Sequence, residues 1–261
     1  MLKKFLIFFS LTIAFSLLFV NKDFAQAKKA PAKKTVVKKT TTVKKTTTAK
    51  KAAPVKKAVI KPAELNGGTI RVRIITDSGT MVIRLYDSTP LHRDNFAKLV
   101  AQGFYDSLMF HRVIPEFMIQ GGDPLSKNAP SGTTLGNGGD DMARIPAEFK
   151  PYLFHKKGVL AAARDNNPEK ASSACQFYIV EGKTWTDAEL DGMESRAGKK
   201  YTAEQRSIYK EQGGTPFLDM GYTVFGEVES GMEVIHKIAT VPRDGADRPL
   251  GNVRMHIELV K

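Results

Sequence analysis

The sequence predicts a mostly-β fold, a closed eight-stranded antiparallel β-barrel capped by two α-helices. The composition, with 42% hydrophobic and 26% charged residues, is typical of a globular domain and excludes a wholly disordered, collagen-like or multi-span membrane chain. Eight short apolar segments are separated by clusters of turn residues, and only two helical patterns occur outside one polar insert. The single cysteine excludes an internal disulfide framework and a cysteine-rich zinc site.

The domain opens with a β-hairpin followed by a helix. Residues 69–76 and 80–86 alternate apolar and polar side chains around a turn at 77–79, which indicates two paired strands. Pro90 then marks the first turn of a helix, and Gly103 marks its end. The apolar stripe of this helix predicts that one of its faces is buried against the sheet.

Six further strands and one further helix follow. The strands are predicted at residues 109–114, 117–120, 158–163, 176–180, 222–228 and 253–260. The second helix is expected at about residues 232–239. This count favours an antiparallel barrel with a helix over each open end.

Residues 184–215 form an insert of different character. Thr186 and Thr202 are each followed three residues later by Glu or Gln, which is the spacing of a capping box and predicts the start of a polar helix. Gly213 and Gly214 end the second helix. We therefore expect a small helical hairpin that joins the predicted strand at 176–180 to the segment that carries Phe217.

Residues 1–27 have the features of a secretory signal peptide. Lys3 and Lys4 precede an uncharged apolar run at 5–20, and the small-residue pattern Ala25-Gln26-Ala27 follows it. The run of sixteen residues is shorter than the roughly 20 that a spanning helix needs. We expect cleavage after Ala27 and an exported protein, periplasmic or secreted, with a retained membrane anchor as the alternative.

Residues 28–62 are a low-complexity Lys/Thr/Ala/Pro segment, called the lysine linker below. It holds thirteen lysines and no acidic residue, which equals the net charge of +13 of the whole chain. Like charges repel and no aromatic residue is present, so we predict a disordered linker before a folded domain at 63–261. We interpret it as a solvated spacer, with electrostatic contact to an anionic surface as the alternative and no specific nucleic acid as partner.

A continuous motif at residues 110–123, FHRVIPEFMIQGGD, resembles the signature of the cyclophilin family of peptidyl-prolyl cis–trans isomerases. Two further blocks agree in order, GVLAAAR at 158–164 leading to QFYI at 176–179, and FLD at 217–219 leading to YTVFG at 222–226. The resemblance implies an eight-stranded barrel with two capping helices. It also implies an isomerase that acts on proline-containing protein clients, unfolded or folded. We expect the protein to be a monomer.

Rotation of an X–Pro bond needs few kinds of side chain. The barrier of about 18–20 kcal/mol reflects lost amide resonance, so no nucleophile, metal or cofactor is required. A donor that favours the twisted amide and an apolar socket for the proline ring suffice. The resemblance assigns the catalytic role to Arg112, whose guanidinium is permanently charged. The substrate-binding positions that it implies are Phe117, Met118, Gln120, Ala163, Arg164, Gln176, Tyr178, Phe217, Leu218 and Tyr222.

Four of these positions depart from the usual family pattern. Phe217 stands where many relatives carry Trp, and Tyr222 where many carry His. Tyr178 replaces a common Phe, and Arg164 replaces a common Asn. The socket remains lined by aromatic residues, so we expect activity, whereas the substrate preference stays open.

Other reactive side chains are given structural roles. Strand alternation places Cys175 on the face opposite Gln176, so we predict a buried thiol. The same alternation turns His111 away from Arg112, and we interpret His111 as structural. The loop acids, Asp123 among them, lack the spacing of a cation site, so we interpret them as solvated turn residues and predict no metal.

Two alternative functions stay open. A binding protein or chaperone would hold proline-containing segments in the same socket with little turnover. An adhesion module would act through the lysine linker, although the intact motif around Arg112 argues against it. For the insert, one hypothesis is a lid that moves at a hinge at Gly213-Gly214, and the other is a surface excursion without function.

Overall fold

The computed structural model describes residues 69–260. The predicted signal peptide, the lysine linker and the domain boundary at residue 63 lie outside the described residues. Within residues 69–260, no helix has both the length and the apolar character needed to cross a membrane.

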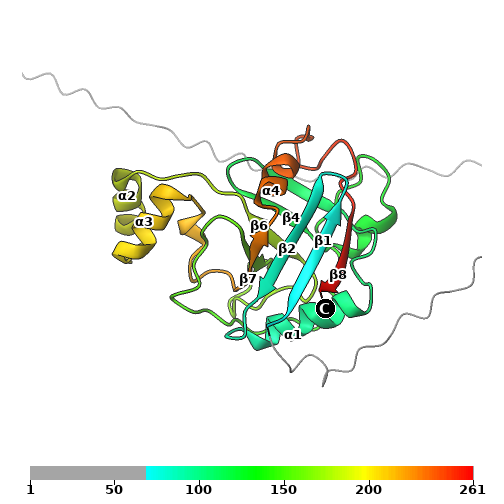
Figure 1. The fold of residues 1–261 in the computed structure, drawn as a ribbon, viewed down its shortest axis with the longest axis horizontal. Coiled ribbons are helices and arrows are strands. Elements are labelled where there is room, and N and C mark those ends of the chain that lie inside the picture. The colour runs from blue at the N-terminus through cyan, green and yellow to red at the C-terminus, as the bar shows by residue number, and fades with distance from the viewer. Residues whose placement is uncertain (1–68, 261) are drawn as a thin grey trace, which may run out of the picture. The chain divides into compact units, whose positions relative to one another are not determined.

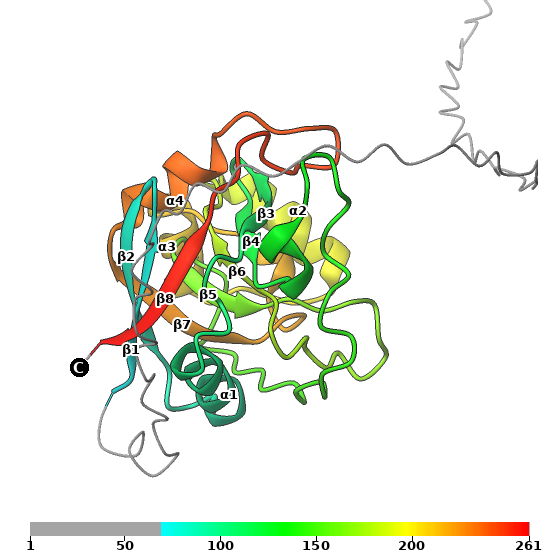
Figure 2. The same ribbon diagram turned by 90° about the vertical axis from the view of Figure 1, so that its right-hand side faces the viewer.

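Eight antiparallel strands form one curled sheet in the order β3-β4-β6-β5-β7-β2-β1-β8, as Figures 1 and 2 show. The strands are β1 (Arg71–Thr76), β2 (Gly79–Leu85), β3 (Phe110–Ile114), β4 (Met118–Gly121), β5 (Val159–Ala162), β6 (Phe177–Val180), β7 (Val224–Ser230) and β8 (Met255–Val260). All eight coincide with predicted segments to within a few residues, because each is a short apolar run bounded by turn residues.

The sheet is an open half-barrel, so the prediction of a closed barrel is wrong. The edge strands β3 and β8 form no ladder, and an isolated bridge joins Met109 to Arg254 just before them. Further along β3, the N–H of Val113 donates instead to the carbonyl of Asp247, at 2.9 Å, in the loop before β8. That loop contains Pro242 and Pro249, which lack the N–H that a strand needs, so it covers the edge without extending the sheet.

Two helices lie at opposite ends of the half-barrel, α1 (Pro90–Ala101) and α4 (Met232–Ala239), as Figures 1 and 2 show. Helix α1 begins at Pro90 and buries Phe96, Leu99 and Val100, as its apolar stripe predicted. Helix α4 buries Val234, Ile235 and Ile238 against the same core.

The insert contains two more helices, α2 (Asp187–Ala197) and α3 (Ala203–Glu211), which extend to one side of the sheet in Figure 1. Both begin at the predicted capping boxes, with Thr186 and Thr202 as the N-cap residues. The hairpin has a small apolar core of its own, formed by Phe154, Leu190, Met193, Tyr201 and Tyr209. Residues 69–260 therefore contain four α-helices, two over the sheet and two in the insert.

The glycine pair that ends the insert is packed too tightly to act as a free hinge. The N–H of Gly214 donates to the carbonyl of Lys183 at 3.0 Å, and Gly213 accepts from the N–H of Lys157 at 3.1 Å. A Cβ at Gly214 would lie 2.3 Å from the carbonyl oxygen of His155, so only glycine fits this approach. Motion here would break these contacts, which argues against the lid hypothesis and for a fixed attachment of the insert.

Two predictions about reactive side chains, Cys175 and Asp123, are decided by how deeply these residues are buried. Cys175 is buried in the main core as predicted, and this burial raises the pKa of its thiol to about 11. Asp123 is fully buried, so its interpretation as a solvated turn acid is wrong. Its carboxylate accepts the N–H of Leu125 at 2.7 Å and caps the 3-10 helix η2 (Pro124–Asn128).

Candidate active site

Nine of the eleven predicted site residues line one pocket of about 180 Å³, called the socket below. They are Arg112, Phe117, Met118, Gln120, Ala163, Arg164, Tyr178, Leu218 and Tyr222. The sheet itself aligns the central ones, since Gln120 on β4 pairs directly with Arg112 on β3 and with Tyr178 on β6. Direct cross-strand partners lie on the same face of a sheet, so a cation, an amide and an aromatic ring stand in one row.

Arg112 is the cation of this row, and its side chain is 43% exposed. Its nearest carboxylate is that of Asp247, with 3.9 Å between Nε of Arg112 and Oδ2 of Asp247. The carboxylate of Asp247 lies closer to Arg243, with 3.1 Å between Oδ1 of Asp247 and Nε of Arg243, so the two arginines share its negative charge. The guanidinium of Arg112 is therefore oriented without being neutralised, and its N–H groups remain available to a ligand in the socket.

The apolar part of the socket is a cluster separate from the main core. Met118 and Tyr178 are buried in it, and Phe117, Leu218 and Tyr222 are partly buried against it. The backbone carbonyls of Gly221 and Asp165 accept hydrogen bonds from Arg164, whose guanidinium lies 4.7 Å from the centre of the Tyr222 ring. Arg164 therefore braces the wall of the socket by a cation–π contact.

A buried network holds Tyr178 from behind. The hydroxyl of Tyr178 lies 2.9 Å from Nε2 of His155, and Nδ1 of His155 lies 2.9 Å from Asp219. Asp219 also accepts the hydroxyl of Tyr209 at 2.7 Å and the backbone N–H of His155 at 2.8 Å. One tautomer satisfies every group, with Tyr178 donating to Nε2 and Nδ1–H donating to Asp219. The polar end of Tyr178 thus bonds to His155 behind the ring, and the ring serves the apolar wall.

Burial has a consistent effect on the two tyrosines of this network. It raises the pKa of Tyr178 well above its usual range, with smaller contributions from Tyr222 and Asp219. Burial also raises the pKa of Tyr209, and the nearby Asp219 carboxylate adds to this increase. Both hydroxyls therefore stay protonated at neutral pH and act as donors.

Two predicted binding residues lie outside the socket. Gln176 lines an adjoining cavity of about 180 Å³, and its amide donates to the carbonyls of Gly136 and Gly138 at 2.9 Å. It touches the socket indirectly, by accepting from the amide of Gln120 at 3.3 Å. Phe217 faces the insert, where it lines a different hollow.

His111 departs from the predicted strand alternation. The pairing of β3 with β4 shifts register between Phe110 and Arg112, and such a bulge redirects the side chain next to it. His111 consequently lines the same cavity as Arg112, of about 280 Å³, instead of pointing away from it. Burial lowers the pKa of His111 to about 4, so the imidazole is neutral at pH 7.

Sequence reasoning missed the network behind Tyr178. Asp219 stands inside a recognised motif, but its role requires His155 and Tyr209, which lie in separate segments and carry no shared spacing. The only available signal was the tyrosine at position 178, since a hydroxyl beside a buried wall needs a partner.

Comparison with known proteins places these features in a family. A family model described as cyclophilin type peptidyl-prolyl cis-trans isomerase/CLD matches residues 71–258. A Staphylococcus saprophyticus protein named as a peptidyl-prolyl cis-trans isomerase is 32% identical over 202 residues, which cover 76% of this chain and 95% of that protein. A Streptococcus pyogenes protein named as a bifunctional phosphatase/peptidyl-prolyl cis-trans isomerase is 35% identical over 188 residues, which cover 70% of this chain but only 37% of that longer protein.

The fold agrees with a solved structure. The crystal structure of a Cryptosporidium parvum cyclophilin type peptidyl-prolyl cis-trans isomerase superposes with a TM-score of 0.53 at 24% identity, covering 74% of this chain and 99% of that one. Fold, family model and relatives therefore agree, and the chain belongs to the family of cyclophilin-type peptidyl-prolyl cis–trans isomerases and is an isomerase of X–Pro bonds.

Proposed function

We propose that this chain isomerises X–Pro bonds of exported proteins and so assists their folding, by non-covalent stabilisation of the twisted amide. The observation that supports this is the position of Arg112, whose charged guanidinium stands in a cross-strand row with Gln120 and Tyr178 at an apolar socket. The socket is of a size for a small ring, at about 180 Å³.

Each side chain has a role that follows from its surroundings. Phe117, Met118 and Leu218 hold the proline ring, which fixes one side of the bond. As the amide twists and loses resonance, the proline nitrogen becomes a better hydrogen-bond acceptor, and Arg112 donates to it. That donor acts more strongly on the twisted amide than on the planar one, so it lowers the barrier. Gln120 orients the client backbone by hydrogen bonds.

Catalysis of a proline-limited refolding reaction tests this function against simple holding. Uncatalysed X–Pro exchange takes tens of seconds, so a slow refolding phase reports it directly. We expect substoichiometric mature protein to accelerate that phase in proportion to its concentration. A holding protein would slow refolding and would act only near equimolar concentration, and that result would contradict the proposal.

We also propose that the protein works outside the cytoplasm after cleavage behind Ala27, with the lysine linker as a cationic spacer. The apolar run at 5–20 with its small-residue cleavage pattern supports export. The thirteen lysines at 28–62 support a salt-sensitive contact with an anionic surface.

Fractionation of cells that make the full chain, or a chain without residues 28–62, tests this location. The exported protein should begin at Lys28, and only the chain with the linker should be retained on anionic cell-wall material or vesicles, releasing as salt is added. Peptide turnover should be equal for both. Retention that survives the deletion, or that ignores salt, would contradict the role of the linker.

A further inference from the structure

A second hollow, called the insert groove below, lies between the insert and Phe217. It has a volume of about 400 Å³ and is lined by Trp185, Met193, Tyr201 and Phe217, together with the cations Arg196 and Lys199. Phe217 is 52% exposed, which is unusual for so large an apolar side chain. The isomerisation mechanism makes no use of this groove.

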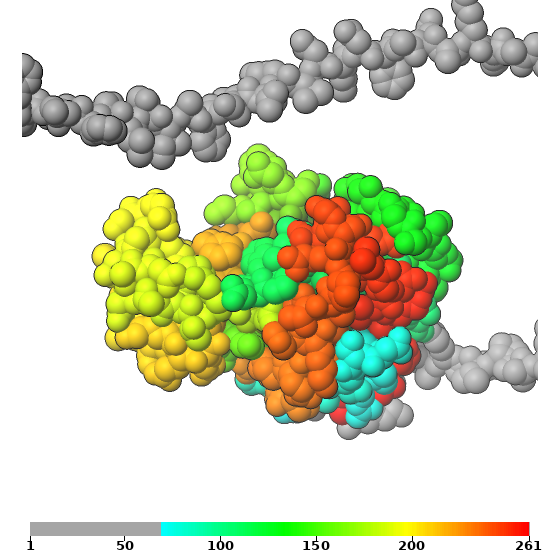
Figure 3. Space-filling view, turned by 90° about the horizontal axis from the view of Figure 1, so that it is seen from above, coloured from blue at the N-terminus to red at the C-terminus, as the bar shows by residue number. Residues whose placement is uncertain are grey.

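Aromatic rings connect the groove to the socket without a break. Phe117, in the socket wall, lies 5.7 Å from Phe217 between ring centroids, and Phe217 lies 6.3 Å from Trp185. In Figure 3 the yellow insert lies at the left, and the light-orange segment that follows it in the chain lies between the insert and green residues of the barrel. A client leaving the socket past Phe117 would therefore run over Phe217 into the groove.

The groove is built before any client arrives. The indole N–H of Trp185 donates to the carbonyl of Gly214 at 2.9 Å, and the hydroxyl of Tyr201 donates to that of Pro216 at 3.1 Å. Both aromatic walls are thus tied to the segment that carries Phe217. A wall fixed in this way binds with little ordering cost.

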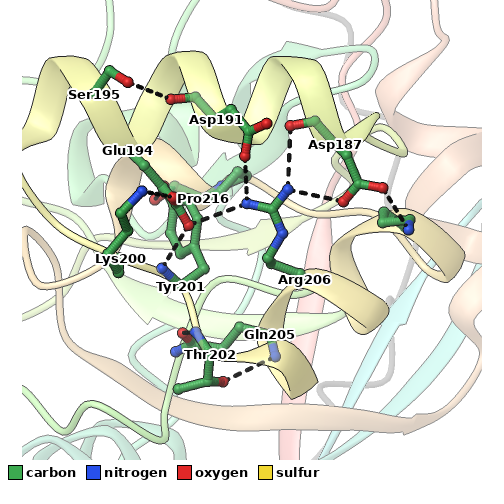
Figure 4. A network of polar contacts seen from close by, with 11 residues as sticks. Asp187, Asp191, Glu194, Ser195, Lys200, Tyr201, Thr202, Gln205, Arg206 and Pro216 are labelled. Carbon is green, nitrogen blue, oxygen red and sulfur yellow. Dashed lines mark hydrogen bonds and ion pairs between the residues drawn. The ribbon is translucent and has the colours of Figure 1, made fainter.

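The two helices of the insert are also joined to each other. Figure 4 shows Arg206 of α3 reaching three carboxylates of α2, at 2.8 Å to Asp187, 2.9 Å to Asp191 and 3.2 Å to Glu194. Glu194 is buried and also accepts the N–H of Tyr201 at 3.0 Å. A network of this kind, partly buried, holds its members in one arrangement more firmly than isolated surface pairs do.

Both charged residues that line the groove, Arg196 and Lys199, are cations. No ion pair within residues 69–260 involves Arg196, and Lys199 donates only to the carbonyl of Asp219, at 3.0 Å. No carboxylate lines the groove. A lysine-rich segment has the wrong charge for this groove, whereas an aromatic side chain with an acidic neighbour matches both the walls and the charge.

We propose that the insert groove binds an aromatic side chain of the client, about three to four residues from the proline at roughly 3.3 Å per extended residue. An acidic residue beside it faces Arg196 and Lys199. The proposal rests on the proposed function, because the proline held in the socket sets where the rest of the client lies. The insert then acts as a specificity element of the enzyme.

Turnover of matched peptides tests the proposal. Peptides with a central Ala-Pro would carry Phe-Glu three or four residues before or after the proline, and their partners would carry Ala-Gln. On one of the two sides of the proline, Phe-Glu should lower KM about five- to tenfold through partial burial of the ring, with kcat unchanged. A remote contact that is equally strong in the ground state and in the transition state lowers KM and leaves kcat unchanged.

Fluorescence gives a readout that does not depend on activity. Trp185 is the only tryptophan of the chain and lines the groove, so the tryptophan emission reports on the groove wall. The favoured Phe-Glu peptide should change this emission saturably, at the concentration that matches its KM, and its Ala-Gln partner should leave the emission nearly unchanged.

Two variants and one control locate the effect. Arg196→Glu reverses the charge, and Ala197→Phe fills the groove from an exposed position, so either should remove most of the Phe-Glu preference. Lys237→Glu makes the same charge reversal on the exposed face of α4 and should keep it. None of the three should change turnover of a short Ala-Pro peptide.

The outcomes separate this proposal from the proposed function. Normal turnover of the short peptide without any Phe-Glu preference would overturn the groove and leave the isomerase mechanism standing. If the short peptide is not turned over, the proposed function fails, and the Trp185 titration still decides whether the groove binds.

Discussion

Replacing Arg112 with alanine should lower kcat/KM for X–Pro isomerisation by about thirty- to a thousand-fold, or roughly 2–4 kcal/mol of transition-state stabilisation. The loss should be large because no other cation lies in the cross-strand row with Gln120 and Tyr178. The fold should survive, since the side chain is 43% exposed and its contact with Asp247 is long, at 3.9 Å. A coupled tetrapeptide assay measures the rate, and circular dichroism checks the fold.

A matched control separates the role of Arg112 from a general effect of charge. Arg73→Ala removes a similarly exposed arginine, at 41%, from β1 and should leave turnover unchanged. Arg112→Lys keeps the charge without the planar fork and should fall between alanine and wild type. Equal turnover by Arg112→Ala and wild type would rule out this residue as the catalytic donor.

Replacing Asp219 with alanine should destabilise the protein by about 3–5 kcal/mol, the loss expected when a buried polar network is left without its acceptor. Its carboxylate, only 8% exposed, accepts from His155 twice and from Tyr209 once. The substitution leaves these buried donors without an acceptor. It also removes the contact that orients His155, the hydrogen-bond partner of the Tyr178 hydroxyl. Denaturant unfolding measures the stability, and the tetrapeptide assay measures the accompanying loss of activity.

Replacing Asp219 with asparagine separates the loss of the carboxylate as hydrogen-bond acceptor from the loss of the whole side chain. Asp219→Asn keeps the shape and one acceptor oxygen for His155, so it should be less destabilising than alanine. Asp94→Ala removes an exposed carboxylate on α1 and should leave the midpoint of unfolding nearly unchanged. If Asp219→Ala unfolds at the same denaturant concentration as wild type, the network does not support the socket.

Much of the site was predictable because it depends on short-range patterns. The motif at 110–123 placed Arg112, Phe117, Met118 and Gln120, and the structure brings all four to the socket. The second motif placed Tyr178 on the face opposite Cys175, which period-two alternation decides within a single strand. The catalytic and binding roles of these residues stay predictions until the variants are measured.

What the sequence did not place depends on contacts between distant segments. Phe217, predicted to bind substrate, lines the hollow beside Trp185, a residue thirty-two positions earlier in the chain, and does not line the socket. The closed barrel failed because a proline-containing loop, and not a continuation of β8, covers the edge of β3. A bulge at His111 redirected a side chain that regular alternation would have turned away.

The sequence by itself determined the strands, the helix starts, the buried thiol and the family, since turn residues, capping boxes and apolar periodicity act over a few neighbouring positions. Only the tertiary structure decided which side chains meet. His155, Tyr209 and Asp219 converge behind Tyr178 from separate segments, and the insert forms a fixed groove beside the socket. These outcomes follow from burial and packing, because most polar groups in a dry interior form a hydrogen bond with a partner that the fold brings near, often from a distant segment.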